Sequence, residues 1–218
     1  TTTYQTKIAD LASPLAVYLR LRDLYPKSLL LEGTDFRGAD DCRSFICCDP
    51  IAELRVEEGL AHISFANQPT ETHPIKKGTG FQEEINAFLA AFNHSSESAP
   101  PGAVNGIFGY ASWDAIEYME NLSFTKPRDK ATSIPEVRFI AYRYILAFNP
   151  LRNEVHIIEN AVDGEKRSEE RATFLRAAFH GSIQVHPFAT KGPEQSNLSH
   201  EQHLDLIVRC KKHIARGD

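Results

Sequence analysis

The sequence contains few of the residues that build metal or redox sites. Its 218 residues include four cysteines, one methionine and one tryptophan, and no two cysteines have the spacing Cys-x-x-Cys. Zinc sites and dithiol redox sites depend on such spacings, so neither is predicted. We expect the adjacent Cys47 and Cys48 to be reduced thiols that pack as small apolar groups.

Long apolar runs and a surplus of basic residues are also lacking. No apolar run comes near the ~18–20 residues that span a bilayer, and no basic stretch followed by an apolar one marks a signal peptide. The net charge is -5 at pH 7, so general binding to nucleic-acid phosphates is not expected, although a local site for a small anion is compatible with it. We therefore expect a soluble, cytoplasmic protein with neither a membrane nor a nucleic acid as partner.

Motifs of nucleotide-binding and hydrolytic enzymes do not occur. The chain has no P-loop, no Gly-x-Gly-x-x-Gly, no Gly-x-Ser-x-Gly and no internal repeat. His200, Glu201 and His203 lie close together, but they lack the i, i+4 histidine spacing of a zinc helix, and no third ligand is evident. We predict no metal site and no bound cofactor in this chain.

The pattern of apolar residues predicts an α+β fold, with a mostly antiparallel sheet and helices at its periphery. Hydrophobic residues make up 42% and charged residues 24% of the chain, as in ordinary globular proteins. Strand-like segments follow one another more often than they alternate with helices, which favours hairpins over βαβ units. The predicted strands are 29–31, 44–48, 51–56, 60–65, 104–110, 134–149 and 154–159, and the predicted helices begin near 13, 81, 165 and 199.

A charged connection between the first two predicted strands is the most distinctive stretch. It follows Leu29–Leu31 and ends before a strand that Asp49-Pro50 is expected to close. Its charged residues are Glu32, Asp35, Arg37, Asp40, Asp41 and Arg43. Glu32 could accept a hydrogen bond from a ligand ammonium while Arg43 binds a ligand carboxylate, or the two could form an ion pair with each other. Residue chemistry leaves both interpretations open.

Two further groups of residues are weaker candidates. Asp114 and Glu117 stand at i, i+3 on one face of a short predicted helix, a spacing that suits acid–base work but is common on protein surfaces. Gly109, inside a predicted strand and near Trp113, indicates that another group packs close to the backbone there.

The end of the sequence predicts a separate helical segment. Ser199 to Gln202 match a capping box, an apolar stripe follows, and Gly217 stands where a helix C-cap glycine is expected. An amphipathic helix after a polar stretch indicates a domain boundary. We predict an N-terminal domain over 1–180, a linker over 181–198, and the start of a second domain over 199–218.

Three stretches together resemble the family of anthranilate synthase component I, among the chorismate-utilising enzymes. They are 29–46 with its Leu-Leu-Leu-Glu-Gly motif, 106–114 with Gly-Ile-Phe-Gly-Tyr-Ala-Ser-Trp-Asp, and 203–218 with its Ala-Arg-Gly-Asp ending. The resemblance spans nearly the whole chain and implies that the chain is the N-terminal region of such a protein. The third stretch is similar to the helix that opens the chorismate-binding domain.

The resemblance implies a regulatory role. Members of the family convert chorismate and ammonia to anthranilate and pyruvate in tryptophan biosynthesis, use magnesium, and take ammonia from a glutamine amidotransferase, component II. Those catalytic groups would lie beyond this chain, so no catalytic residue is expected in it. The implied tryptophan feedback site includes Glu32, Gly33 in place of the family's serine, and Arg43. The alternatives are aminodeoxychorismate synthase component I, an isochorismate or salicylate synthase, and a free-standing amino-acid-binding module.

Overall fold

The structure, a computed structural model, describes residues 1–10, 12–33, 42–92, 98–124, 133–162, 168–183 and 185–218. Two compact units make up the chain, Thr1–Gln184 and Val185–Asp218. The strands are β1 (Thr2–Ile8), β2 (Leu29–Leu31), β3 (Ser44–Glu57), β4 (Leu60–Phe65), β5 (Glu71–Pro74), β6 (Ile107–Ala111), β7 (Val137–Asn149) and β8 (Glu154–Asn160). The helices are α1 (Pro14–Leu21), α2 (Gly80–Ala90), the 3₁₀ helix η1 (Trp113–Tyr118), α3 (Ser168–His180) and α4 (His200–Arg216).

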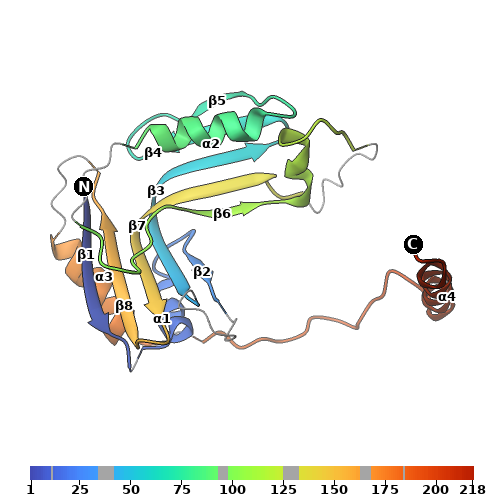
Figure 1. Ribbon diagram of the computed structural model, residues 1–218. Helices are drawn as coiled ribbons and strands as arrows, with labels where there is room; N and C mark the ends of the chain where they lie inside the picture. Colours follow the sequence, from blue (N-terminus) through green and yellow to red (C-terminus); the bar gives the residue numbers. More distant parts are fainter. Residues whose placement is uncertain (11, 34–41, 93–97, 125–132, 163–167, 184) are drawn as a thin grey trace. The chain divides into compact units, whose positions relative to one another are not determined.

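The first unit is built on one antiparallel sheet. Its strands follow the order β1-β8-β7-β3-β4-β5, with β2 paired to β3 and β6 paired to β7 (Figure 1). The strand pairs run antiparallel throughout. The chain therefore has the predicted α+β fold, in which hairpins make the sheet and helices lie against it.

The long strand β3 corrects one sequence-based expectation. Asp49-Pro50 was expected to end a strand, but β3 continues through both residues and stays paired to β7 on either side of them. The register shifts between Pro50 and Ala52, and Asp49 has a φ of 60°. A β-bulge accommodates a proline without ending the ladder. Arg143 Nε donates to Asp49 Oδ2 at 2.8 Å and so supports the strained residue.

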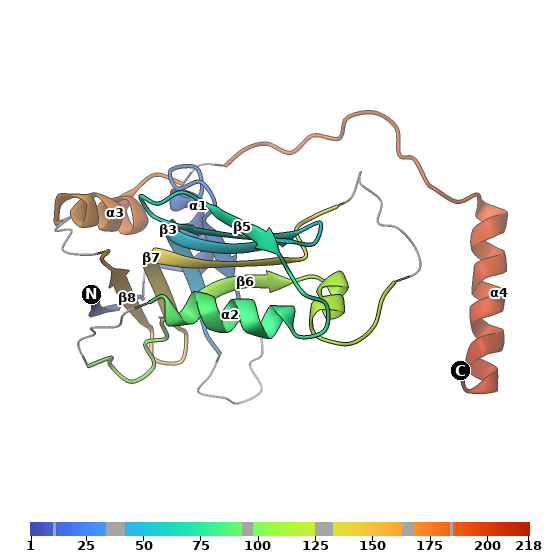
Figure 2. The same cartoon turned by 90° about the horizontal axis from the view of Figure 1, so that it is seen from above.

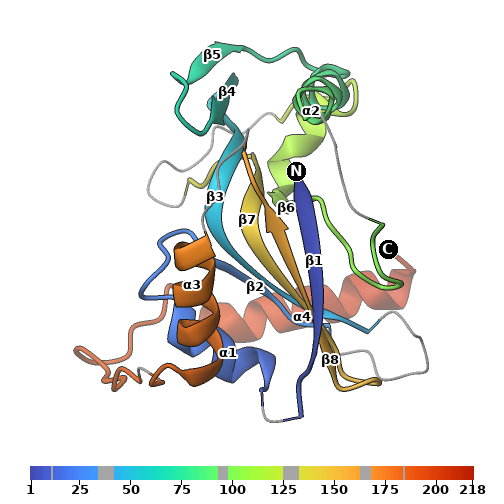
Figure 3. The ribbon, with the colours of Figure 1, turned by 90° about the vertical axis from the view of Figure 1, so that its left-hand side faces the viewer.

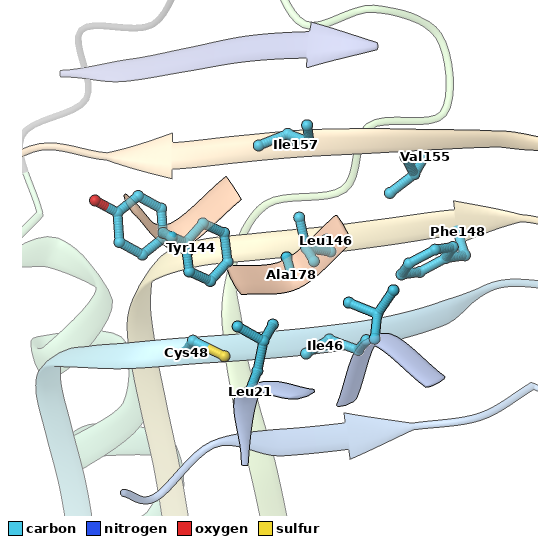
Figure 4. Close-up of a cluster of buried hydrophobic side chains, with 11 residues drawn as sticks. Leu21, Ile46, Cys48, Tyr144, Leu146, Phe148, Val155, Ile157 and Ala178 are labelled. Carbon is cyan, nitrogen blue, oxygen red and sulfur yellow. The ribbon is translucent and has the colours of Figure 1, made fainter. Parts of the chain in front are cut away.

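One core fills the space between α1, α3 and the first half of the sheet, which is the half where β3 begins and β7 ends. Ile46, Leu146 and Ile157 stand directly opposite one another on β3, β7 and β8 and form a row of buried side chains (Figure 4). Leu21 of α1 and Phe174 of α3 are fully buried against this surface. Ser13 caps α1 by accepting from the Ala16 amide at 3.2 Å, as its position before Pro14 predicts.

The other half of the sheet is covered by α2. Along β3, Ala52, Leu54 and Val56 are buried, whereas the residues between them are half-exposed. Phe88 of α2 is buried against Ala52 and Leu54. Figures 2 and 3 show α2 running alongside this half, with α1 and α3 at the opposite end of β3 and β7. One face of these strands is thus covered by α2, and the other carries polar side chains.

The second unit contains the helix α4. Ser199 Oγ accepts from the Gln202 amide at 3.2 Å and Gln202 Oε1 accepts from the Ser199 amide at 2.8 Å, which is the predicted capping box. Gly217 closes the helix with a φ of 81°, also as predicted. No helix among the described residues has the length and apolarity needed to cross a membrane.

Candidate functional site

The predicted site residues lie where β2 ends and β3 begins. Glu32 and Gly33 follow β2, and Arg43 precedes β3. The Gly33 amide donates to the Arg43 carbonyl oxygen at 3.2 Å, so the β2–β3 ladder continues beyond the pair Leu31 and Phe45. The other charged residues predicted here, Asp35, Arg37, Asp40 and Asp41, lie outside the described residues.

Register separates the side chains of Glu32 and Arg43. In an antiparallel pair, residues directly opposite share a face and neighbours along a strand alternate. Because Leu31 pairs with Phe45, Glu32 shares a face with Ser44, and Arg43 shares the other face with Phe45. Gly33 is therefore brought against Arg43, whereas Glu32 is not. This geometry disfavours the ion pair that residue chemistry alone left open.

Residue 33 is confined by the neighbouring backbone. A Cβ placed on Gly33 would lie 2.6 Å from the Arg43 carbonyl oxygen and 3.2 Å from its amide nitrogen. Real Cβ atoms essentially never come within 3.0 Å of a heavy atom from a residue that is not their own or a chain neighbour. Cys42 adds a contact on the same residue, since its Sγ donates to the Gly33 carbonyl oxygen at 3.2 Å. Glycine is thus the residue that fits this close approach of β2 to β3.

Arg43 reaches toward β8 and the segment before β6. Gly102 has a φ of 91°, and a Cβ built on it would lie 3.1 Å from Arg43 Nη2 and 3.6 Å from His156 Nε2. The guanidinium and the imidazole therefore both pack against the Gly102 backbone. His156 is 3% exposed, and its Nδ1 is 3.0 Å from Thr6 Oγ1 on β1.

Burial keeps the His156 imidazole neutral. Burial lowers the pKa of His156, and the nearby positive charges of Arg43 and Arg152 lower it further, although Glu154 acts in the opposite direction. Arg43 is consequently the cation of this pair at neutral pH, and its guanidinium suits an anionic group. Sequence reasoning missed both His156 and Gly102. A single histidine inside the apolar strand Glu154–Asn160 was the available signal for the first.

The weaker candidates Glu117 and Gly109 make contacts that hold the fold together. Glu117 Oε1 accepts from the Phe124 amide at 2.7 Å and lies 3.4 Å from Lys77 Nζ, so it ties η1 to its neighbours. Gly109 is packed so closely on β7 that a Cβ would overlap the Arg138 carbonyl oxygen, as the glycine in a strand predicts. Trp113 is 81% exposed. Within the described residues, no group of three or more His, Cys, Asp or Glu side chains is arranged to hold a metal ion.

Comparison with known proteins adds an independent finding. A family model described as chorismate binding enzyme matches residues 33–218. Anthranilate synthase component 1 of Thermus thermophilus is 26% identical over 98% of this chain and 44% of its own length. The protein of that name from Pseudomonas aeruginosa is 27% identical over 97% of this chain and 44% of its own length. The chain thus spans less than half of these curated relatives.

A solved structure also aligns with the chain. It is the crystal structure of anthranilate synthase component I from Streptococcus pneumoniae, 18% identical, with a TM-score of 0.47. The alignment covers 96% of this chain and 45% of that one.

Proposed function

Since this chain belongs to the family of chorismate-binding enzymes, we propose that it is the N-terminal part of an anthranilate synthase component I. The observation that carries the proposal is the extent of the match: relatives of that name align with almost the whole chain but with 44% of their own length. The whole protein would convert chorismate and ammonia to anthranilate and pyruvate in tryptophan biosynthesis. It would be cytoplasmic and receive its ammonia from a glutamine amidotransferase, component II.

In this proposal the catalytic groups lie outside the 218 residues. Magnesium would hold chorismate in the part of the whole enzyme that lies outside this chain; among the described residues, no group of three or more His, Cys, Asp or Glu side chains is arranged to hold a metal ion. No catalytic step is therefore assigned to a side chain of this chain. Its contribution would be the scaffold and the regulatory site.

The regulatory site would be a partial tryptophan pocket at the β2–β3 ladder. Arg43 would bind the ligand carboxylate, because its guanidinium presents a forked set of donors that fits a carboxylate. Glu32 would accept a hydrogen bond from the ligand ammonium. Its side chain lies on the other face of β2, the strand that pairs with β3. Gly33 would contribute backbone alone, since it has no hydroxyl. The pocket would be completed by residues beyond this chain.

Product analysis tests the enzymatic part of the proposal. The longer protein that the gene encodes, which contains these 218 residues and continues past Asp218, is incubated with chorismate, ammonium and magnesium. Anthranilate is followed by its fluorescence. Anthranilate and pyruvate in equal amounts are the expected products. Formation of aminodeoxychorismate, isochorismate or salicylate would assign the chain to another chorismate enzyme. Under the same conditions the 218-residue chain is expected to form no anthranilate, and turnover by it would refute its assignment as a non-catalytic part.

Calorimetry tests the regulatory part. The encoded longer protein is titrated with tryptophan, alongside Arg43→Gln and the control Lys76→Gln, which removes an exposed cation that pairs with Glu83. Loss of a charge-assisted hydrogen bond predicts about tenfold weaker binding for Arg43→Gln and unchanged binding for the control. Equal affinities for wild type and Arg43→Gln would remove Arg43 from the site. A stop codon directly after Asp218 would instead favour a free-standing amino-acid-binding module.

A further inference from the structure

A polar cavity of about 330 Å³ lies on the half of the sheet that carries α2, but on the face that α2 does not cover. Ala52, Leu54 and Ile63 pack on the α2 side. Because strand residues alternate, the intervening residues of β3 and β4 face the other way and line the cavity. Strands β7, β3 and β4, which lie side by side in Figure 1, supply most of its side chains. The polar residues used below are Lys27, Glu53, Arg55, His62, Ser64 and Arg138.

Strand register places like charges directly opposite each other in this cavity. Arg55 on β3 pairs with Arg138 on β7 and, on its other side, with His62 on β4. Two cations directly opposite on neighbouring strands destabilise a sheet, unless a negative charge lies between or above them.

The one carboxylate among the described residues that line the cavity is already engaged. Glu53 Oε2 accepts from Lys27 Nζ at 2.9 Å and Glu53 Oε1 accepts from Arg138 Nε at 2.8 Å. Partial burial would raise the pKa of Glu53, but the hydrogen bonds and charges of these two cations lower it, so the carboxylate is ionised at neutral pH. Against this single carboxylate stand three basic side chains of the lining, Lys27, Arg55 and Arg138.

Arg55 is the cation with the weakest protein partner. Its Nη1 lies 3.3 Å from Glu57 Oε2, and both side chains are about 40% exposed, at 41% and 38%. Exposed pairs of this kind contribute little, because water and salt compete for both charges. Ser64, directly opposite Glu53 on β4, adds a hydroxyl to the lining of the cavity.

We propose that this cavity is a binding site for a small oxyanion, a carboxylate or a phosphate, held by Arg55 and Arg138 with Ser64 and His62 at its side. Guanidinium groups bind both anions through paired hydrogen bonds, and an anion placed there relieves the repulsion across the strands. The volume of about 330 Å³ matches the lower range of small-molecule sites. None of its lining residues belongs to the proposed tryptophan site at Gly33 and Arg43, and the inference does not depend on that site.

The test uses the 218-residue chain and inorganic phosphate. Phosphate is titrated at constant ionic strength, with sodium chloride as the balancing salt, and backbone amide shifts are followed by NMR. Saturable shifts of β3, β4 and β7 residues around the cavity are expected. Arg55→Gln should weaken binding by about tenfold, because it removes a charged donor. Ser64→Ala, which removes only a hydroxyl, should weaken it by roughly threefold.

The matched control is Lys76→Gln, which removes the same charge from an exposed side chain that does not line the cavity. Its phosphate affinity should equal that of the wild type. Equal weakening by Arg55→Gln and Lys76→Gln would show general screening and overturn the proposal, as would shifts that never saturate. A malonate titration distinguishes the source: tighter binding than phosphate assigns a carboxylate ligand, and weaker binding assigns a phosphate.

Discussion

Replacing Gly33 with serine restores the residue that the resemblance assigns to this position, and the structure predicts that it destabilises the protein. A Cβ at this position would lie 2.6 Å from the Arg43 carbonyl oxygen, and it must retreat to at least 3.0 Å. The Gly33 amide donates to that same oxygen at 3.2 Å. A retreat of 0.4 Å would lengthen the donor–acceptor distance to as much as about 3.6 Å, which is beyond hydrogen-bond range.

The size of the effect follows from these two losses. Inserting a carbon into a closely packed position costs about 1–3 kcal/mol, and a lost backbone hydrogen bond costs about 1 kcal/mol. Because the end of a strand can relax in part, we expect Gly33→Ser to lower the free energy of unfolding by about 2 kcal/mol. For a chain of this length that corresponds to a fall in Tm of about 4–8 °C. Urea unfolding followed by circular dichroism measures the free energy directly.

Gly106→Ser is the matched control. A Cβ added to Gly106 would meet no heavy atom within 4 Å, and this glycine has no positive φ. The same substitution there should therefore change the free energy of unfolding by less than about 0.5 kcal/mol. Equal stability of Gly33→Ser and wild type, or a more stable Gly33→Ser, would refute the steric argument. In the proposed enzyme, Gly33→Ser should also fail to strengthen tryptophan binding, because the displaced strand end carries Arg43.

Three further outcomes are expected. Gly109→Ala should abolish folding, seen as loss of soluble protein, because its Cβ would overlap a carbonyl oxygen of β7; wild-type yield would contradict this. Glu53→Gln should lower the unfolding free energy by about 1 kcal/mol at pH 7. Because the folded-state pKa of Glu53 is lowered, that difference is complete above about pH 5 and should shrink as the pH falls toward 3; a difference that persists at pH 3 would contradict an ionic origin. Burial raises the pKa of Cys48 to about 12 and raises that of Cys47 as well, so in a thiol-reagent assay exposed Cys210 should react in the folded protein, whereas Cys47 and Cys48 should react only after unfolding.

Local signals with a single physical meaning predicted structure well. The serine–proline start of α1, the capping box at Ser199 and the αL glycine at 217 each satisfy backbone groups at a helix end, and each was found as predicted. The hairpins β3–β4 and β7–β8 were also predictable, because apolar strand segments flank short turns. These features depend on residues within a few positions of one another.

Features decided by distant partners were not predicted. β1 is a polar edge strand whose residues carry little apolar signal, and it exists because β8 supplies hydrogen-bond partners along its length. β5 lies outside all the predicted strands, and it pairs with β4 despite a proline at its end. β3 continues through Pro50 because β7 runs beside it across the bulge. Strand pairing therefore overrode the local sequence in all three places.

The candidate site shows the same division between local and distant effects. Motif and charge placed Glu32, Gly33 and Arg43 together along the sequence, but register puts the two charged side chains on opposite faces of the sheet. The partners that define the Arg43 environment, Gly102 and His156, lie far away in the chain and become neighbours only through the pairing of β3, β7 and β8. Glycine at 33 is then explained by close backbone packing rather than by loss of a ligand contact. In the proposed tryptophan site, Arg43 and Glu32 would therefore reach the ligand from opposite faces around the backbone of residue 33, and the remaining contacts would come from outside the described residues.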